Sequence, residues 1–285
     1  FIPERPIREL RDLTRYKTSL IQIVSSERNR FMKILEDANI KLSSVLSDVF
    51  GATGTKIMNH VFACEDYRPE ELLQYVHGRV KATRAEIMEA LTGYITPHHR
   101  FMLKKILENI GRIECTIREV DAQIEACIEP YKVERELLET IPGVHKESAT
   151  RIIAEIGVDM SQFPDQNHLA SWAGVCPGSN ETAGKNKSGR ITHGNKYLRS
   201  LLVESGWAAS RTKNTYMSAK YKCLVGRRGK KKAIIALGHK ILIATYFILR
   251  DKVQFKELGE DHLNNYRKDR LIAYYQKQLE KLTAA

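Results

Sequence analysis

The residue types best suited to chemistry gather in one stretch, residues 177–199, which reads PGSNETAGKNKSGRITHGNKYLR. It combines hydroxyl groups, basic side chains and glycines, and it lies between two segments with helical apolar spacing. Glycine lets a backbone approach a ligand closely because it has no side chain in the way. Basic groups stabilise charge that develops on a phosphoryl group, and a hydroxyl can act as nucleophile. The composition therefore indicates either phosphate chemistry or a loop that only binds phosphate.

Hydroxyls and cations are spread along the whole of this loop. The hydroxyl-bearing residues are Ser179, Thr182, Ser188 and Thr192. The cations are Lys185, Lys187, Arg190, Lys196 and Arg199. The last two fall in the first turn of a predicted helix, where the helix dipole disfavours positive charge. A bound anion would offset that cost, and we predict that all five cations bind nucleic acid.

The positive charge of the chain is concentrated after residue 176. Residues 177–250 contain 16 Lys and Arg against two acids, whereas the remainder contains 30 basic and 32 acidic residues. A solvated surface usually mixes its signs, so this asymmetry points to a polyanionic partner. Nucleic acid fits better than an acidic membrane surface, because no amphipathic segment offers the apolar face that membrane binding needs. No run of about 18 apolar residues occurs, so we expect no membrane span.

A second basic cluster comprises Arg227, Arg228, Lys230, Lys231 and Lys232. Five cations in six residues repel one another unless a ligand neutralises them. The pattern predicts an apolar helix directly after them, over residues 233–249. A basic cluster at the start of a helix is suited to contact with a phosphate backbone, so we predict nucleic-acid binding here as well.

Apolar residues at helical spacing predict a long helix over residues 6–37 and several short helices over residues 40–95. The cations of the long helix face either solvent or a nucleic-acid backbone. Residues 101–128 give the most regular pattern, with apolar residues at alternating spacings of three and four. These residues are Leu103, Ile106, Ile110, Ile113, Ile117, Val120, Ile124 and Cys127. This heptad seam packs either on residues 6–37 or on another copy of the chain as a coiled coil.

Residues 134–157, ERELLETIPGVHKESATRIIAEIG, read as two helices joined by a tight turn at Pro142 and Gly143. The pattern resembles a helix-hairpin-helix, whose turn and following helix N-terminus face a DNA phosphate. Gly143 is therefore a predicted nucleic-acid contact. The second glycine usual in that motif is replaced by His145, so the alternative is a hairpin that serves only in packing.

Together these elements predict a mainly α fold. A long helical coiled-coil stalk is expected over residues 1–130, and a compact helical domain over residues 131–285. Five scattered cysteines without a CxxC pair indicate free thiols rather than disulfides or a zinc site. No metal is predicted in this chain.

On four segments the sequence resembles the transposases of the insertion sequence 110 type, which are related to the Piv-type DNA invertases and are bridge-RNA-guided recombinases. The segments are residues 10–48, the hairpin IPGVHKESATRIIAEIG, the loop SWAGVCPGSNETAGKNKSGRITHGNKYLR, and RRGKKKAIIALGHKIL. The loop, with its flanking PG and GNKYLR, is the most specific of them. The resemblance implies a transposase domain over residues 131–285 and a coiled-coil region that helps to hold multimers together.

The resemblance also implies a catalytic hydroxyl. Similar proteins have a serine directly before a small residue, Gly and Lys, and here Thr182 occupies that position in the segment ETAGK. Threonine keeps the hydroxyl but adds a methyl group that crowds in-line attack on phosphorus. The implied reaction is DNA recombination through a covalent hydroxyl–phosphodiester intermediate, with Lys185, Arg190 and Arg199 nearest the phosphate.

In this family an N-terminal RuvC-like domain carries four metal-binding acids, and we expect it to have no counterpart in this chain. Mg²⁺ is expected for that domain, and no cofactor for this chain. We therefore expect this chain to bind nucleic acid but not to recombine it alone.

The partners that the resemblance implies are donor and target DNA, a structured guide RNA, and further copies of the chain in a dimer or tetramer. The expected location is the cytoplasm of a prokaryote, in association with the nucleoid. Two other functions fit the same residues. One is a non-catalytic nucleic-acid-binding module, such as a truncated remnant, in which Thr182 is only a loop residue. The other is a ribonucleoprotein scaffold that holds structured RNA.

Overall fold

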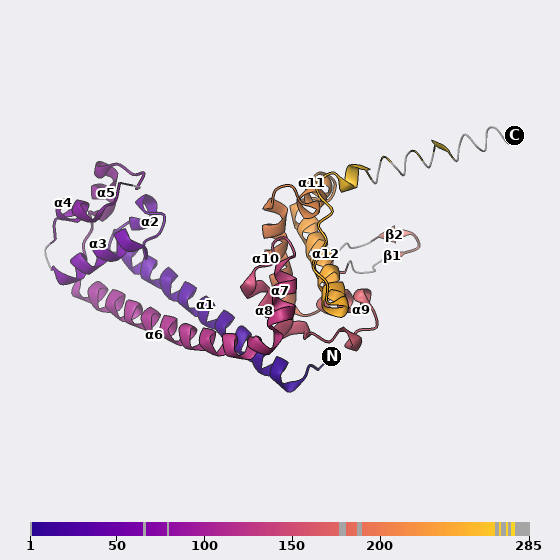
Figure 1. Cartoon of the computed structure of the whole chain (residues 1–285). Coiled ribbons are helices and arrows are strands. Elements are labelled where there is room, and N and C mark those ends of the chain that lie inside the picture. The colour runs from indigo at the N-terminus through magenta and orange to yellow at the C-terminus, as the bar shows by residue number, and fades with distance from the viewer. Residues whose placement is uncertain are drawn as a thin grey trace. The chain divides into compact units, whose positions relative to one another are not determined.

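The computed structural model describes residues 2–64, 67–78, 80–176, 181–186, 190–265, 268, 272 and 275–276, without the side chains of Glu181, Thr182, Lys185 and Asn186. The chain folds almost entirely into helices, which confirms the predicted mainly α fold (Figure 1). It divides into two compact units. Unit 1 comprises Phe1–Arg15 and Ile124–Ala285, and unit 2 comprises Tyr16–Gln123. Residues 2–15 fall in the stalk predicted over residues 1–130, but in the structure they group with the C-terminal helices in unit 1.

The helices follow one another with short connections. Unit 2 contains most of α1 (Arg5–Asp37) and of α6 (Pro97–Ile128), and between them α2 (Leu42–Val45), α3 (Ala52–Ala63), α4 (Pro69–Leu72), the 3-10 turn η1 (Leu73–Tyr75) and α5 (Arg84–Leu91). Unit 1 contains η2 (Glu129–Tyr131), α7 (Lys132–Glu139), α8 (Lys146–Ile156), η3 (Met160–Gln162), α9 (Gln166–Ala173), β1 (Glu181–Thr182), β2 (Lys185–Asn186), α10 (Lys196–Arg211), α11 (Tyr216–Arg228) and α12 (Lys230–Asp251).

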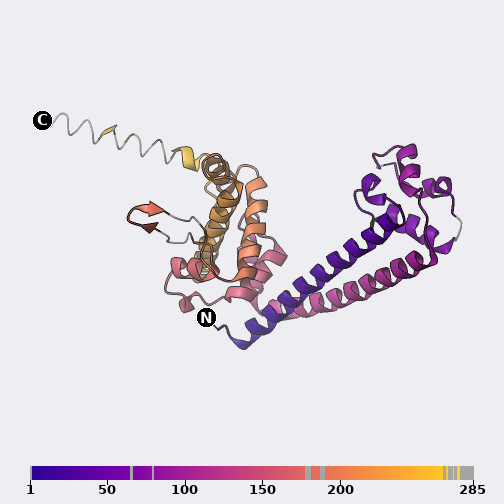
Figure 2. The same cartoon turned by 180° about the vertical axis from the view of Figure 1, so that it is seen from behind.

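Within unit 2, α1 and α6 lie side by side and run antiparallel (Figures 1 and 2). Two ion pairs join them: Lys17 Nζ lies 2.7 Å from Asp121 Oδ1, and Arg28 Nη2 lies 3.1 Å from Glu114 Oε1. The pair with the higher residue number on α1 has the lower residue number on α6, as expected for antiparallel helices. Two cations of the long helix are thus held by acids of α6.

The heptad seam predicted in α6 is the face that packs on α1. One buried cluster includes Val24, Phe31 and Leu35 of α1 with Leu103, Ile106 and Ile110 of α6. Ile113 and Ile117 pack against this cluster and are partly buried. The seam therefore packs within the chain, which was one of the two alternatives. A coiled coil with another copy stays a prediction.

At the centre of unit 1, α12 packs against α7, α9, α10 and α11. In the described part of the chain, α12 is the one helix long and apolar enough to cross a membrane by length and composition, but 56% of its most apolar window is buried inside the protein. Its apolar residues are thus used in the core of unit 1.

Two glycines set the register of α10 against α12. A Cβ built on Gly206 would lie 3.2 Å from the Ile234 carbonyl oxygen, and one on Gly238 would lie 3.1 Å from the Leu202 carbonyl oxygen. Small residues at these positions let the two helices approach closely. Because residue 202 lies opposite 238 and 206 opposite 234, the two helices are antiparallel.

A third glycine holds the α7–α8 hairpin against α10. Gly143 is buried with φ +84°, and a Cβ there would lie 2.4 Å from the Ala209 nitrogen and 2.5 Å from the Ser205 carbonyl oxygen. Close packing of the hairpin against α10 therefore explains why residue 143 is a glycine. The predicted phosphate contact of Gly143 stays untested, and its buried position favours the packing alternative.

We expect Gly143→Ala to destabilise unit 1 by at least about 2–3 kcal/mol, because the new methyl group meets backbone atoms at a positive φ. Chemical denaturation without any nucleic acid measures the effect. Gly226→Ala is the matched control: this exposed glycine in α11 has no atom within 4 Å of a built Cβ. It should stabilise the protein by about 0.5–1 kcal/mol through helix propensity. Equal effects of the two substitutions would contradict the packing role of Gly143.

Candidate nucleic-acid interface

The two ends of the glycine-rich loop meet at its base. The Thr192 amide donates to the Cys176 carbonyl at 3.3 Å, and the Asn195 amide donates to the Trp172 carbonyl at 3.3 Å. Between these bonds Gly174, which caps α9 with φ +71°, meets Gly194. A Cβ built on Gly194 would lie 2.4 Å from the Gly174 nitrogen. The base can therefore close only because both positions are glycine.

Between these ends, the loop carries a short antiparallel hairpin (Figure 2). Its register pairs Thr182 with Lys185 and Glu181 with Asn186. The two residues of the turn, Ala183 and Gly184, both have positive φ, +51° and +74°. That combination is typical of a type I′ turn, which suits the right-handed twist of two paired strands. The residue proposed as nucleophile thus directly precedes a tight turn and pairs with a cation of the loop.

Asn195 lies at the exit of the loop, and its side chain caps the N-terminus of α10. Its Oδ1 accepts hydrogen bonds from the amides of Tyr197 at 3.0 Å and Leu198 at 3.1 Å, which satisfies two of the free donors of the helix N-terminus. Its Nδ2 donates to Glu155 Oε2 at 2.5 Å. One amide therefore joins the loop exit, the start of α10 and the carboxylate of α8.

Glu155 is a buried carboxylate with a side chain only 4% exposed. Arg15 donates to its two oxygens in parallel, both at 2.8 Å, while Arg11 lies 3.8 Å away. Arg11 also donates to the carbonyls of Ala154 at 2.9 Å and of Glu155 at 2.7 Å, which lie in the last turn of α8. A cation there complements the helix dipole. The hydrogen bond to Glu155 raises the pKa of Arg15, whereas burial lowers the pKa of Arg11.

Tyr197 extends this cluster toward the first turn of α10. The Arg15 guanidinium lies 4.2 Å from the centre of the Tyr197 ring, and Lys196 Nζ lies 5.0 Å from it. Both distances are within the range of cation–π attraction. The start of α10 is thus surrounded by cations although Glu155 neutralises part of their charge.

A cysteine and a histidine pack together beside the loop base. Cys176 Sγ lies 4.0 Å from His239 Nδ1 of α12. Burial raises the pKa of the Cys176 thiol. Burial also lowers the pKa of His239, Lys240 lowers it further, and a hydrogen bond to the Val175 backbone opposes both. Both groups are therefore neutral at physiological pH, and their contact is packing rather than a thiolate–imidazolium pair.

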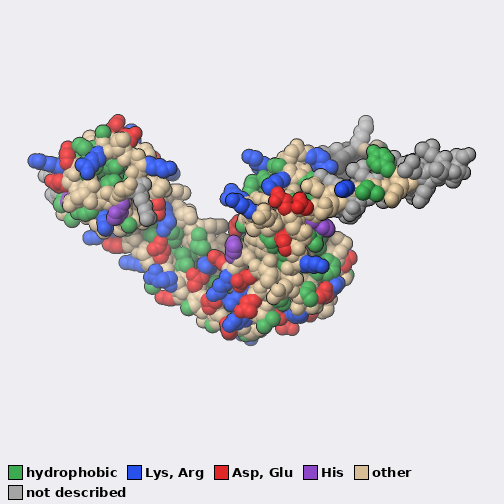
Figure 3. All heavy atoms as spheres, turned by 45° about the horizontal axis from the view of Figure 1, so that its top comes forward, with side chains coloured by type: hydrophobic (Ala, Val, Ile, Leu, Met, Phe, Trp, Pro, Cys, Tyr) green, Lys and Arg blue, Asp and Glu red, His purple; other side chains and the backbone are tan. Residues whose placement is uncertain are grey.

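The structure separates the predicted cations into two sets. Lys196, which is exposed, and Arg199, which is half-buried, lie in the first turn of α10, and Arg190 is exposed just before it. Arg227, Arg228, Lys230, Lys231 and Lys232 are all exposed where α11 ends and α12 begins. In Figure 3, Lys and Arg side chains project from the part of unit 1 that carries α11. Lys187, with the hydroxyl residues Ser179 and Ser188, lies outside the described residues.

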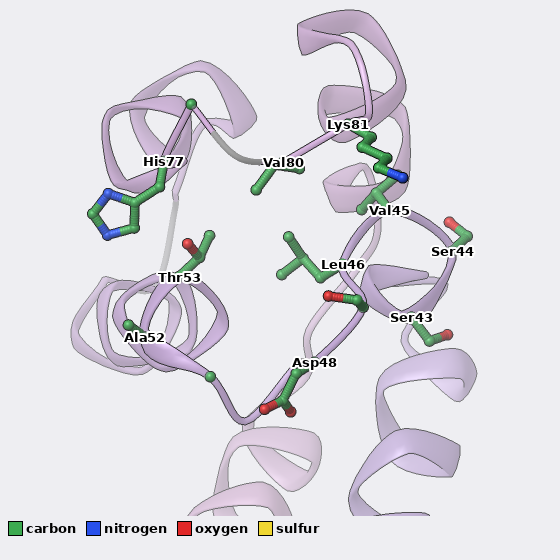
Figure 4. Close-up of a pocket in the computed structure, with 13 residues that line it drawn as sticks. Ser43, Ser44, Val45, Leu46, Asp48, Ala52, Thr53, His77, Val80 and Lys81 are labelled. Atoms are coloured by element: carbon green, nitrogen blue, oxygen red, sulfur yellow. The ribbon is translucent and has the colours of Figure 1, made fainter. Parts of the chain in front are cut away.

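Unit 2 has an open pocket of about 980 Å³ between α2, the start of α3 and the segment before α5 (Figure 4). Polar groups line it, among them Asp48, His77 and Lys81. Asp48 accepts a hydrogen bond from the Phe50 amide at 2.9 Å. In the described part of unit 2, these three side chains form no hydrogen bond or ion pair with one another, and we assign no chemistry to this pocket.

The residues that hold the interface together were not predicted from the sequence. The sequence predicts that the cations of the long helix, which include Arg11 and Arg15, face solvent or a nucleic-acid backbone, and it assigns no role to Glu155. A signal did exist: Glu155 is a lone acid in the apolar segment IIAEIG, and such an acid requires a buried cationic partner. Asn195 could have been recognised as the residue type that caps a helix.

A match to a known protein family covers this same region. Residues 135–222, from α7 into α11, match the protein-family model described as Transposase IS116/IS110/IS902 family. Two curated proteins, each named pilin gene-inverting protein, come from Moraxella lacunata and Moraxella bovis. Each is 30% identical to this chain over 154 residues, which is 52% of this chain and 48% of the relative. The chain therefore spans about half the length of the curated relatives it matches.

Asn195→Asp tests the link between the loop exit and Glu155. Aspartate caps a helix as well as asparagine does, but here it would place a second carboxylate against Glu155. We expect a loss of about 2–4 kcal/mol at pH 7, measured by denaturation, because a buried charge loses a donor and gains a like charge.

Asn195→Ser, which keeps a capping oxygen but removes the amide that reaches Glu155, serves as the control and should cost less, because it adds no like charge. A neutral effect of Asn195→Asp at pH 7 would contradict the geometry.

Proposed function

We propose that the chain is a subunit of a DNA transposase or recombinase, because residues 135–222 match the family model described as Transposase IS116/IS110/IS902 family and 154 residues are 30% identical to the pilin gene-inverting proteins. The observation that supports this most strongly is the match itself, since it contains the α7–α8 hairpin, the glycine-rich loop and α10. The concentration of positive charge after residue 176 fits a polynucleotide substrate.

In this proposal Thr182 is the nucleophile. Its oxygen forms a bond to a backbone phosphorus while the bond from that phosphorus to one sugar oxygen breaks. The threonine gives up its proton, and the displaced sugar oxygen takes one up. A hydroxyl of a second strand end then attacks the same phosphorus and releases the threonine, so the energy of the phosphodiester bond is kept.

Positive charge at the loop stabilises the phosphoryl group during both steps. Lys185 is paired with Thr182 across the hairpin, and Arg199 lies in the first turn of α10, which Asn195 fixes to Glu155. We place these two residues and Arg190 nearest the reacting phosphate. Lys187, Lys196 and the cations at the start of α12 would hold more distant phosphates.

In the described part of the chain, no group of three or more His, Cys, Asp and Glu side chains is placed to hold a metal ion. We propose that the reaction also uses Mg²⁺ held by the acids of a RuvC-like domain, where it would polarise the phosphodiester. What this chain contributes is the hydroxyl, the cations and the rigid base of the loop.

We also propose a structured guide RNA as a second polynucleotide partner, and association of copies through the long helices α1 and α6. The partly buried middle of the α6 seam, at Ile113 and Ile117, supports such association. A cytoplasmic location beside DNA follows from these partners.

Covalent trapping tests the proposed chemistry. The complete gene product is incubated with cognate DNA that carries a strand break, so that a displaced end diffuses away, and the adduct is mapped by peptide mass spectrometry. We expect a DNA–peptide bond at Thr182, loss of the adduct in Thr182→Val, and faster formation in Thr182→Ser because the crowding methyl group is gone.

An adduct that persists in Thr182→Val would contradict the assignment of the nucleophile. An adduct with serine but none with threonine would instead support a non-catalytic binding module for this version of the chain. Thr192→Val, which removes a hydroxyl at the loop base, is the matched control and should keep the adduct.

A further inference from the structure

The exposed cations where α11 meets α12 take no part in the proposed exchange of bonds at Thr182. We call Arg227, Arg228, Lys230, Lys231 and Lys232 the α12 cluster. All five side chains are exposed. In the described part of the chain, none of them forms an ion pair with an acid, whereas the nearby Lys222 pairs with Glu260 at 2.9 Å. The α12 cluster therefore presents its charge to an external ligand.

The α12 cluster lies at the opposite end of the α10–α12 pair from Lys196 and Arg199. Residue 202 lies opposite 238, and residue 206 opposite 234. Lys196 and Arg199 therefore lie beside residues near 241–244, which are 10 to 13 positions along α12 from Lys231. At a rise of 1.5 Å per residue the two sets are about 15–20 Å apart along the helix pair. One phosphate cannot contact both sets.

The side chains of the α12 cluster indicate what it binds. The segment RRGKKK offers positive charge and no aromatic ring for base stacking. Single strands are usually held by stacking on aromatic side chains, which are absent from this segment. Charge alone recognises a phosphate backbone, and it is most effective where phosphates are densest, along a double helix.

The position of the lysines adds an energetic reason. Lys230, Lys231 and Lys232 occupy the first turn of α12, which contains no acid, and the N-cap residue Gly229 makes no side-chain bond. Positive charge at a helix N-terminus opposes the dipole, and neighbouring cations repel one another. A polyanion relieves both effects at once.

We propose that the α12 cluster is a second nucleic-acid site, which binds the backbone of a double helix about 15–20 Å from the loop cations. This inference takes the class of ligand from the proposed function but does not depend on chemistry at Thr182. A duplex that reaches both sets must extend about four to six base pairs between them, at 3.4 Å per base pair.

Salt-dependent binding of the complete gene product tests this site. The probes are a 24-base-pair DNA duplex, a 24-base-pair RNA duplex and a 24-nucleotide single strand, all of unrelated sequence. We expect the triple variant Lys230→Ala/Lys231→Ala/Lys232→Ala to lose at least tenfold in duplex affinity. The slope of log K against log salt should fall by about 2–3 for a duplex and by less than about 1 for the single strand.

The charge-matched control is Lys41→Ala/Lys56→Ala/Lys104→Ala, three exposed lysines of unit 2. It should leave the duplex slope unchanged, and thermal melting should show both triple variants folded. A duplex slope that does not change in the α12 triple, or changes equally for the single strand, overturns the second site. The duplex that loses more affinity identifies the ligand as DNA or RNA. If the wild-type protein forms the Thr182 adduct while the α12 triple keeps its slope, only this inference fails, and the proposed function stands.

Discussion

The buried carboxylate of Glu155 is the constraint on which the geometry of the interface depends. An ionised carboxylate with 4% exposure is tolerated only when donors surround it, and here Arg15 and Asn195 contact it while Arg11 lies nearby. The arginines of α1 lie more than a hundred positions before Glu155 in the sequence. Asn195, at the loop exit, lies about forty positions after it. The charge therefore fixes three separate parts of unit 1 relative to one another.

This arrangement gives the loop a rigid base. Glycines close the base, Asn195 fixes its exit to Glu155, and α10 starts from the same residue. The hairpin with Thr182 and Lys185 lies between these fixed ends. A phosphoryl-transfer site needs its groups placed to within a fraction of an ångström, and a base held by charge and backbone contacts is suited to that task. Cations at the start of α10 then lie where a bound phosphate would offset their cost.

The sequence predicted the helices well, but it did not predict contacts between residues far apart in the chain. The long helix over residues 6–37, the short helices after it and the seam of α6 follow from apolar periodicity, which burial on one face imposes directly. Nothing local shows that Arg15 meets Glu155, because that contact depends on where two helices cross. Gly143 likewise matched a phosphate-binding motif, yet the backbone of α10 lies where its missing Cβ would be.

In the candidate site, too, only the local features could be predicted. The sequence indicates the loop and its cations because their composition is unusual. It does not show that the cations fall into two sets, because that follows from the antiparallel register of α10 and α12, which Gly206 and Gly238 set. A count of charged residues along the sequence treats all the cations as one group. In the fold they lie at opposite ends of the α10–α12 pair.

The most direct measurement of the central claim is the structure of the complete gene product bound to its DNA. We expect a backbone phosphorus about 3–3.5 Å from Thr182 Oγ1, the separation typical of groups about to react. We also expect the Asn195–Glu155 contact to be kept in the complex. Phosphates that cross the α7–α8 hairpin or unit 2, with none near Thr182, would contradict the account.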